Sequence, residues 1–274
     1  MAAPQRVALV TGASSGIGKS CADLLCRAGY RVYGASRRGI DLPEKAPPGL
    51  ASLRMDVTSD DSVREGLHHI LRLEQRLDVL INNAGVGIAG AVEDTSVMEA
   101  LGQFDVNFFG ALRTVRAVLP VMRTQRSGYI VNIGSIGGLI AIPYQGLYSA
   151  SKFALEGLTE SLRLEVSRFG IRVVLIEPGD HRTSFSTNRS FTEESSRNAT
   201  YRESFERATR RMASDEQHGP GPESVARLVH KVINLPNPRL RYTTGPAAQR
   251  TAVWLKRVVP YSIIAKLLAA YYGR

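Results

Sequence analysis

The stretch Val10-Thr11-Gly12-Ala13-Ser14-Ser15-Gly16-Ile17-Gly18 stands between a short apolar run, residues 6–10, and a segment of helical periodicity. Glycines at such a junction permit a tight turn and let the backbone approach a pyrophosphate closely. The free N–H groups at the start of the helix then point toward the anion. The stretch therefore predicts a strand, a turn and a helix that bind a dinucleotide. Because the spacing is G-x-x-x-G-x-G, an ordinary glycine-rich turn is the alternative. The residues we expect to contact the cofactor here are Gly12, Ser14, Ser15, Gly16, Ile17 and Gly18.

Short apolar runs alternate with longer segments of helical periodicity along most of the chain. The predicted strands are residues 6–10, 31–35, 53–57, 79–82, 129–133, 172–176 and 239–243. The predicted helices are residues 17–28, 97–121, 146–168, 222–235 and 251–272. This alternation predicts an α/β fold of the doubly wound Rossmann type, a parallel sheet with helices on both faces. A chain of 274 residues with 43% hydrophobic composition suits one large domain.

Within the single domain 1–274, we expect three parts. Residues 1–179 form the dinucleotide-binding and catalytic core. Residues 180–222 lose periodicity and are rich in Ser, Arg and Glu, which predicts a mobile substrate lid or a partly disordered loop with short helices. The C-terminal tail, residues 245–274, is amphipathic and carries basic side chains among its apolar ones. It either packs as part of the substrate pocket or a dimer contact, or lies on a membrane surface.

The bulk composition excludes some classes of protein. A formal net charge of +10 favours acidic partners, but the arginines are scattered rather than gathered in one basic block, so we expect no nucleic-acid partner. A solvated surface is one interpretation of the charge, and phosphate-bearing ligands or anionic membranes are the other. The two cysteines, Cys21 and Cys26, lie on one predicted helix and suit core packing in a reducing compartment. The histidines form no ligand cluster at a known metal spacing, so we expect no metal.

The apolar runs fall well short of the roughly 20 residues that span a bilayer. The first predicted strand begins almost at Met1, which leaves no room for a secretory signal. We therefore expect a cytoplasmic protein, with peripheral membrane contact through the tail left open.

The second predicted strand ends in Ala35-Ser36-Arg37-Arg38. An NAD enzyme usually places a carboxylate here to hold the ribose hydroxyls, whereas a 2′-phosphate requires arginine and no acid. Arginine holds phosphate bidentately, so Arg37 and Arg38 predict a preference for NADPH over NADH. Two solvated surface arginines are the alternative.

Tyr148 and Lys152 are four residues apart at the start of a predicted helix and so share one face. A free phenol titrates near pH 10, and a nearby cation lowers that pKa, which a tyrosine acid/base requires near neutral pH. Ser135 follows the predicted strand 129–133, at the sheet edge where ligands of open α/β folds bind. A chance helical pair and a simple turn serine are the alternatives for these residues taken singly.

Taken together, the motifs resemble those of the classical short-chain dehydrogenase/reductase family. The matching residues, in the order of the family, are Thr11-Gly12-x-x-x-Gly16-x-Gly18, Asn82-Asn83-Ala84-Gly85, Asn107, Ser135, Tyr148-x-x-x-Lys152 and Pro178-Gly179. The set covers nearly the whole chain, and its conjunction is far more specific than any one motif. The resemblance implies hydride transfer between a nicotinamide and a carbonyl carbon, which interconverts a carbonyl and a secondary alcohol.

The resemblance also implies roles for the catalytic residues. Tyr148 is similar to the proton donor to the carbonyl oxygen, and Ser135 to the residue that orients this oxygen. Lys152 resembles the lysine that lowers the tyrosine pKa and holds the nicotinamide ribose. Asn107 resembles the asparagine that retains a water for proton relay.

Further cofactor contacts follow from the same resemblance. Asp56, followed by Val57, is similar to the adenine contact. The segment Asn83, Ala84 and Gly85 is expected to border the cofactor. Pro178-Gly179 with Thr183 matches the P-G-x-x-x-T pattern that fixes the carboxamide. His181 lies inside this pattern, and we interpret it as a lid surface residue rather than a catalytic one.

The tail and the arginine-rich lid favour a bulky hydrophobic carbonyl substrate, such as a steroid, a retinoid or an acyl-chain ketone. The resemblance implies a homo-oligomer, a dimer or tetramer, built through the helices that bear Asn107 and Tyr148. Two other hypotheses remain, a non-catalytic dinucleotide-binding sensor and a membrane-surface binding protein on the same fold. The intact catalytic set argues against both.

Overall fold

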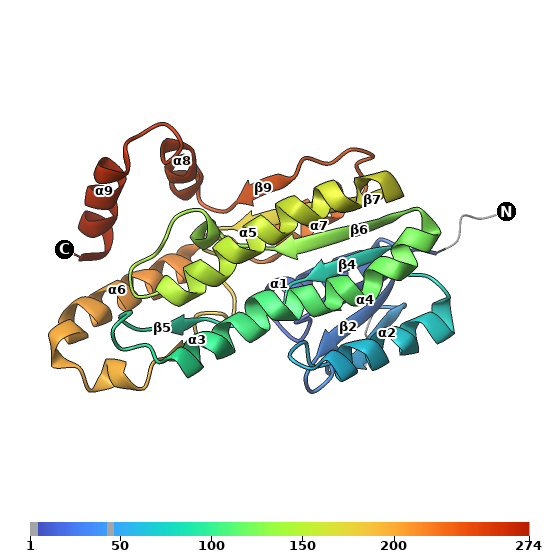
Figure 1. Ribbon diagram of the computed structural model, residues 1–274, viewed down its shortest axis with the longest axis horizontal. Helices are drawn as coiled ribbons and strands as arrows, with labels where there is room; N and C mark the ends of the chain where they lie inside the picture. Colours follow the sequence, from blue (N-terminus) through green and yellow to red (C-terminus); the bar gives the residue numbers. More distant parts are fainter. Residues whose placement is uncertain (1–4, 43–46, 274) are drawn as a thin grey trace.

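A seven-stranded parallel sheet forms the centre of the molecule (Figure 1). The computed structural model describes residues 5–42 and 47–273, so residues 1–4, 43–46 and 274 of the predicted domain lie outside the described part. Among the described residues, the strands follow the order β3-β2-β1-β4-β6-β7-β9, and every neighbouring pair is parallel. The strands are β1 (Val7–Thr11), β2 (Arg31–Ser36), β3 (Leu50–Arg54), β4 (Val79–Asn82), β6 (Gly128–Ile133), β7 (Ile171–Pro178) and β9 (Arg241–Thr244).

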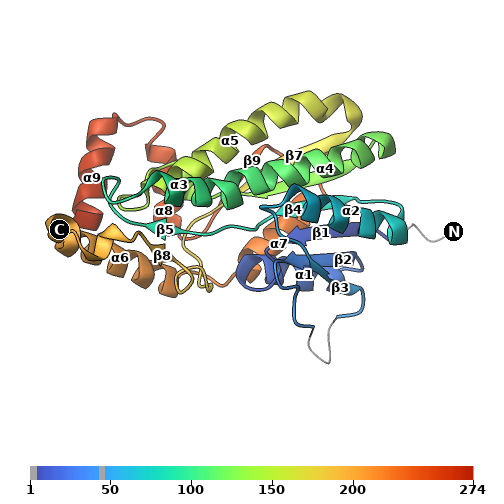
Figure 2. The ribbon, with the colours of Figure 1, turned by 60° about the horizontal axis from the view of Figure 1, so that its bottom comes forward.

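Helices cover both faces of this sheet, as Figure 1 and Figure 2 show. They are α1 (Gly16–Arg27), α2 (Asp60–Glu74), α3 (Val97–Phe104), α4 (Gly110–Gln125), α5 (Gly146–Val166), α6 (Ala199–His218), α7 (Glu223–Val232), α8 (Ala247–Leu255) and α9 (Tyr261–Gly273). Helices α1 and α7 pack on one face, and α2, α4 and α5 pack on the other. The predicted doubly wound Rossmann-type fold in a single domain is confirmed.

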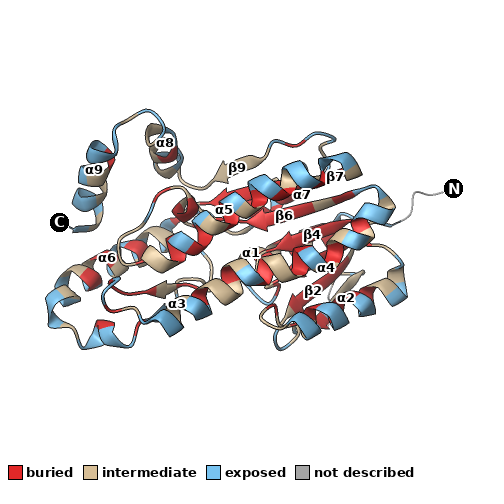
Figure 3. Ribbon diagram, in the orientation of Figure 1, coloured by how far each residue is buried: buried red, intermediate tan, exposed pale blue. Residues whose placement is uncertain are grey.

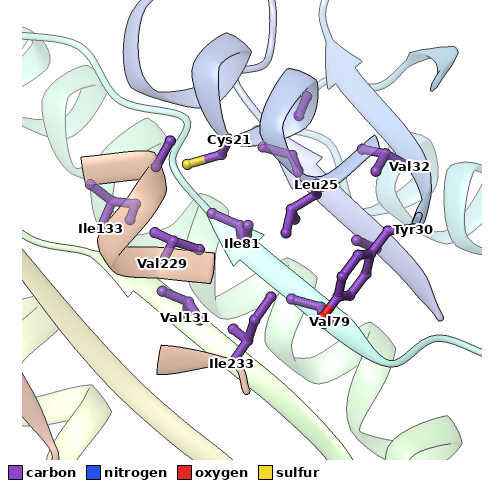
Figure 4. Close-up of a cluster of buried hydrophobic side chains, with 14 of the residues drawn as sticks. Cys21, Leu25, Tyr30, Val32, Val79, Ile81, Val131, Ile133, Val229 and Ile233 are labelled. Atoms are coloured by element: carbon purple, nitrogen blue, oxygen red, sulfur yellow. The ribbon is translucent and has the colours of Figure 1, made fainter. Parts of the chain in front are cut away.

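Alternating strand residues supply the two halves of the core. In β1, Ala8 and Val10 join the cluster beneath α1 and α7 that Figure 4 draws in part, whereas Val7 and Leu9 join the cluster on the opposite face. Successive side chains of a strand point to opposite faces, so a strand covered on both sides is apolar throughout. Figure 3 shows the resulting band of buried residues along the sheet. Cys21 of α1 lies in this core as a free thiol, as expected.

Two predicted elements differ from the structure. The third strand was expected at residues 53–57 but is Leu50–Arg54, because the Asp56 carboxylate accepts hydrogen bonds from the backbone N (3.0 Å) and hydroxyl (2.8 Å) of Thr58 and turns the chain. The predicted helix 97–121 is α3 and α4 joined by one π-helical turn, Asp105–Phe109. Such wider turns often occur at functional sites, and this one holds Asn107.

The predicted lid and tail are more ordered than expected. Residues 180–222 contain α6, a helix of 20 residues, rather than only short helices in a loop. Its buried apolar stripe is only Phe205, Ala208 and Met212, which explains why the periodicity looked weak. The predicted helix 251–272 is broken into α8 and α9 before Pro260, since proline disfavours helical geometry in the residue that precedes it.

Helix α9 packs against α6, where the Tyr271 hydroxyl donates to Asp215 at 2.6 Å and accepts from Arg211 at 2.9 Å. In Figures 1 and 2, α6, α8 and α9 gather at the end of the molecule toward which the strands point. The lid and the tail therefore lie beside the edge of the sheet where ligands bind.

Candidate active site

A cavity at the carboxyl edge of the sheet brings together residues from most of the predicted motifs. Its lining includes Asn83, Gly85, Ser135, Tyr148, Lys152 and Thr183. The ends of β4, β6 and β7 and the start of α5 all contribute to it. The structure thus places residues as far apart in the sequence as Ile17 and Glu216 around one space, as the parallel topology requires.

The predicted catalytic side chains contact one another inside this cavity. Ser135 follows β6, and its hydroxyl accepts from the backbone N of Gly137 at 3.0 Å. Tyr148, on the first turn of α5, is buried, and the Ser135 hydroxyl is near enough to favour its ionised form. One turn later, the Lys152 ammonium lies 5.9 Å from the centroid of the Tyr148 ring and donates to the carbonyl of Ile133 at 2.9 Å.

Burial controls the titration of both groups. It raises the pKa of Tyr148 to about 12, and the nearby Ser135 hydroxyl offsets only part of this rise. It lowers the pKa of Lys152 to about 8. From the sequence we predicted that Lys152 would lower the pKa of Tyr148. In the structure, the free-energy cost of burying the phenolate exceeds the stabilisation that the surrounding protein groups give it, so the pKa is raised.

Asn107 anchors the backbone beside Lys152. Its amide oxygen accepts from the backbone N of Val86 at 2.9 Å, and its amide nitrogen donates to the Val86 carbonyl at 3.0 Å and to Ser151 at 3.1 Å. A Cβ placed on Gly85 would lie 3.4 Å from the Asn107 oxygen and 3.9 Å from the Lys152 nitrogen. Asn107, Gly85 and Lys152 are therefore neighbours.

The glycine turn has the shape that a dinucleotide phosphate requires. Gly12 and Gly16 have positive φ angles of 65° and 54°, which only glycine adopts without strain. A Cβ on Gly18 would lie closer than 3.0 Å to both the Gly12 carbonyl and the Asn83 amide. The side chain of Ser15 does not cap α1, which leaves the N-terminal N–H groups of the helix directed at the turn. The glycines thus let the turn, the Asn83 segment and the residues around Thr183 pack closely together.

The predicted Asn83 to Gly85 segment is tied to this turn. The Thr11 hydroxyl accepts from the backbone N of Asn83 (3.0 Å) and of Ala84 (3.1 Å), and the Asn83 amide donates to the carbonyls of Thr11 (3.1 Å) and Gly12 (3.2 Å). The ends of β1 and β4 are thus held together, and the two cofactor motifs form one surface.

The residues expected at the adenosine end lie together at the ends of β2 and β3. Arg37 and Arg38 are exposed just after β2. Arg37 is near enough to Asp56 to help lower the pKa of that carboxyl, although the hydrogen bond from the Thr58 backbone contributes most. Val57 follows directly, and its carbonyl accepts from Arg113 at 3.2 Å.

Pro178 ends β7, Gly179 follows it, and Thr183 lies over the start of α1. A Cβ on Gly16 would lie 3.4 Å from the Cβ of Thr183, so the third motif closes over the glycine turn. His181 is buried and lines the cavity, so the predicted position on the lid surface was wrong. Its Nδ1 is 2.9 Å from the Gly179 carbonyl and its Nε2 is 3.0 Å from the Ser224 hydroxyl. Its partners show that it fastens the lid to α7.

Sequence patterns did not predict several residues of the cavity. The Phe185 ring lies against Tyr148, with centroids 5.5 Å apart. The lid residue Arg189 forms a buried ion pair with Glu216 of α6, and Glu216 and Asp180 both line the cavity. Their contacts join segments with no fixed spacing, so no motif could have indicated them.

Comparison with known proteins defines the family. A family model described as short chain dehydrogenase matches residues 6–194. The chain is 42% identical over 268 residues to a 3-ketodihydrosphingosine reductase of Bacteroides thetaiotaomicron, with 98% of each chain covered. It is 37% identical to a retinol dehydrogenase 8 of Bos taurus, over 89% of this chain and 83% of that protein. A solved short-chain dehydrogenase from Streptomyces avermitilis has a TM-score of 0.81 at 33% identity, covering 96% of this chain and 95% of that one.

The chain therefore belongs to the short-chain dehydrogenase/reductase family of oxidoreductases, and the resemblance is confirmed. Within residues 5–42 and 47–273, none of the helices combines the length and the apolar composition needed to cross a bilayer.

Proposed function

We propose that this oxidoreductase uses NADP(H) to interconvert a carbonyl group and a secondary alcohol on a bulky lipophilic substrate. The observation that carries the proposal is the gathering of Ser135, Tyr148 and Lys152 in one cavity beside the glycine turn. When bound, the dinucleotide supplies or accepts the hydride at the carbonyl carbon. The protein supplies orientation, a proton and the exclusion of water.

Tyr148 gives its proton to the substrate oxygen, and the Ser135 hydroxyl holds that oxygen in place. A pKa near 12 keeps the phenol protonated at neutral pH, which suits donation during reduction. Lys152, with a pKa near 8, is largely charged at neutral pH and stabilises the phenolate as it forms. Asn107 keeps the backbone beside Lys152 in place, and we extend to it the family role of retaining a water through which the proton is replaced.

The cofactor would lie along the residues predicted for it. The pyrophosphate would face the N–H groups of α1, because the helix start is uncapped and positively polarised. Arg37 and Arg38 would hold the 2′-phosphate, which is the basis of the proposed preference for NADPH. The backbone around Pro178 and Gly179, together with Thr183, would hold the carboxamide.

The names of two relatives, the 3-ketodihydrosphingosine reductase and the retinol dehydrogenase 8, indicate lipophilic substrates, and this supports a lipophilic substrate here. Ile136, Ile142 and Phe185 give the cavity apolar walls close to Tyr148. The expected homo-oligomer stays a prediction, as does a cytoplasmic location.

We also propose that the tail makes peripheral contact with an anionic membrane. Residues 245–274 contain five Lys or Arg and no Asp or Glu. Helices α8 and α9 and the link between them expose Trp254, Val258, Tyr261, Ile263 and Leu267. Exposed apolar groups beside basic ones suit the interface of an anionic bilayer, from which the protein could take a lipophilic substrate.

The test of the main proposal is fluorescence titration with NADPH and NADH, followed by NADPH oxidation against a panel of ketones. Tyr148→Phe should abolish turnover with little change in NADPH affinity. Arg37→Ala should weaken the binding of NADPH more than the binding of NADH. Arg27 is an exposed arginine at the end of α1, and Arg27→Ala should change neither affinity. Retained turnover in Tyr148→Phe would show that Tyr148 is not the proton donor. Equal losses of affinity for NADPH and NADH in Arg37→Ala would show that Arg37 does not bind the 2′-phosphate. Binding without turnover of any ketone would favour the sensor hypothesis.

A further inference from the structure

Helix α8 of the tail has two different faces. Gln249, Val253 and Lys256 are four and three residues apart and so share one face, on which Val253 is 7% exposed. On the other face Arg250 and Trp254 are exposed. A helix that only covered apolar surface would need no polar residues on its inner face. The two polar residues of this face, Gln249 and Lys256, therefore need partners in the protein.

Lys256 binds the chain segment that follows Ser135. Its ammonium donates to the carbonyl of Leu139, and it lies 5.1 Å from the centroid of the Phe153 ring in α5. A hydrogen bond from a charged donor is stronger than a neutral one, and the face of an aromatic ring attracts a cation. Lys256 thus links α8 to the Ser135 segment and to the helix that carries Tyr148.

The segment between Ser135 and Leu139 is a single 3-10 turn. The backbone N of Gly138 donates to the Ser135 carbonyl at 2.9 Å, and the backbone N of Leu139 donates to the Ile136 carbonyl at 2.9 Å. These hydrogen bonds connect the first residue of the segment to the last. A displacement of Leu139 is therefore transmitted to Ser135.

The same turn packs against the catalytic residues of α5. A Cβ on Gly137 would lie 3.2 Å from the Tyr148 ring and 3.3 Å from the Ser135 hydroxyl oxygen. A Cβ on Gly138 would lie 3.0 Å from the backbone of Lys152. At such close approach, small movements of the turn change how the Ser135 hydroxyl faces the Tyr148 phenol.

Gln249 holds the opposite wall of the cavity. Its amide oxygen accepts from the backbone N of Asp180 at 2.9 Å, and its amide nitrogen donates to the Asp180 carboxylate. A Cβ on Gly179 would lie closer than 3.0 Å to the Gln249 oxygen, so glycine is what lets the amide approach the backbone. Pro178, Gly179 and Asp180 all line the cavity. Helix α8 thus contacts both walls of the active site.

We propose that α8 is a positioning element of the active site, in which Lys256 holds the turn that carries Ser135 and Gln249 holds the backbone after β7. Neither side chain lines the cavity, so both act through the residues that they hold. The inference rests on the proposed carbonyl reduction and adds the tail to its machinery. The outer face of the same helix, with Trp254, stays available for the proposed membrane contact.

The experiment uses the full chain, NADPH and a ketone that wild type reduces. Lys256→Met keeps the apolar stem and removes the donor. It should lower kcat about 10- to 100-fold, because a displacement of about 1 Å at the reacting groups can cost about a hundredfold. NADPH affinity, measured by fluorescence titration, should change little. Lys256→Arg keeps a charged donor and should recover most of the lost kcat. Lys231→Met, which removes an exposed lysine of α7, is the matched control and should alter neither value.

A second measurement tests whether Lys256 acts through Ser135. In a Ser135→Ala background the substitution Lys256→Met should have little further effect on kcat, since residues that act as one unit are not additive. Gln249→Leu should give the opposite division of effects. It removes two hydrogen bonds from the segment proposed to hold the carboxamide, so NADPH affinity should fall about tenfold.

The outcomes separate this inference from the proposed function. Wild-type kcat in Lys256→Met, equal losses in Lys256→Met and Lys256→Arg, or a full further loss in the Ser135→Ala background would overturn the role of Lys256 while leaving carbonyl reduction in place. Wild-type NADPH affinity in Gln249→Leu would overturn the role of Gln249. If wild type bound NADPH but reduced no ketone, the proposed function would fail, and this inference with it.

Discussion

Gly18→Ala tests whether the packing of the glycine turn shapes the cofactor site. A Cβ at this position would lie closer than 3.0 Å to the carbonyl oxygen of Gly12 and to the amide nitrogen of Asn83, which hydrogen-bond each other at 3.2 Å. Gly18 does not have a positive φ, so backbone strain plays no part and the effect is steric. Forcing an extra methyl into a packed site costs about 1–3 kcal/mol, and a lost hydrogen bond about 0.5–1.5 kcal/mol.

The gain in helix propensity from alanine, about 1 kcal/mol, offsets part of this cost. We expect the unfolding free energy to fall by about 1–3 kcal/mol, which lowers Tm by roughly 2–4 °C for each kcal/mol in a domain of this size. NADPH affinity should fall at least tenfold, about 1.4 kcal/mol, because the displaced groups border the phosphate turn.

Calorimetry gives the change in stability, and fluorescence titration gives the change in affinity. Gly157→Ala is the matched control, since Gly157 lies in α5 and a Cβ there meets nothing within 4 Å. It should raise stability by about 0.5–1 kcal/mol and leave NADPH affinity alone. If Gly18→Ala bound NADPH as tightly as wild type, the cofactor site would not depend on the close packing of α1 and the glycine turn against the Asn83 segment.

Three further predictions concern the lid, the buried histidine and the tail. Arg189→Ala should lower the unfolding free energy by about 3–5 kcal/mol in urea denaturation, because it leaves the Glu216 carboxylate buried without its partner. A loss below 1 kcal/mol would show that the ion pair does not hold the lid. Burial lowers the pKa of His181, so its stabilising effect is present above its ordinary pKa of about 6.5 and is lost as the pH falls below that value. Tm measured from pH 8 to pH 5 should therefore fall less in His181→Asn than in wild type, and equal slopes would refute this. Trp254→Ser should reduce sedimentation with phosphatidylserine-containing vesicles several-fold, more than Leu164→Ser, an exposed apolar residue of α5. An equal response of the two variants would argue against docking through the tail.

Much of the site was predictable because its residues belong to local patterns. The turn from Gly12 to Gly18 follows a strand and begins a helix, and Tyr148 and Lys152 share a helix face through a spacing of four. The parallel sheet follows from the alternation of strands and helices, and it brings strand ends to one edge whatever the details of packing. These features depend on short-range spacing, which a single sequence displays directly.

Local patterns were less informative where packing overrides them. A strand predicted through Val57 ends at Arg54, and one long predicted helix contains a π-helical turn at Asn107. The apolar stripe of α6 is too narrow for its periodicity to stand out, so a 20-residue helix looked like a loop. In each case a side-chain contact or a neighbouring element decides the local structure.

The sequence by itself determined the family, the glycine turn and the candidate catalytic set, since each depends on residue types at fixed separations. Only the tertiary structure decided that His181 is buried, that Arg189 pairs with Glu216 across 27 positions, and that Gln249 holds Asp180 across 69. These pairs join a lid, a long helix and a tail whose separations in the chain are not fixed by any repeat. Their partners are selected by which surfaces pack together, because a buried charge or polar group is stable only beside a partner that the fold brings to it.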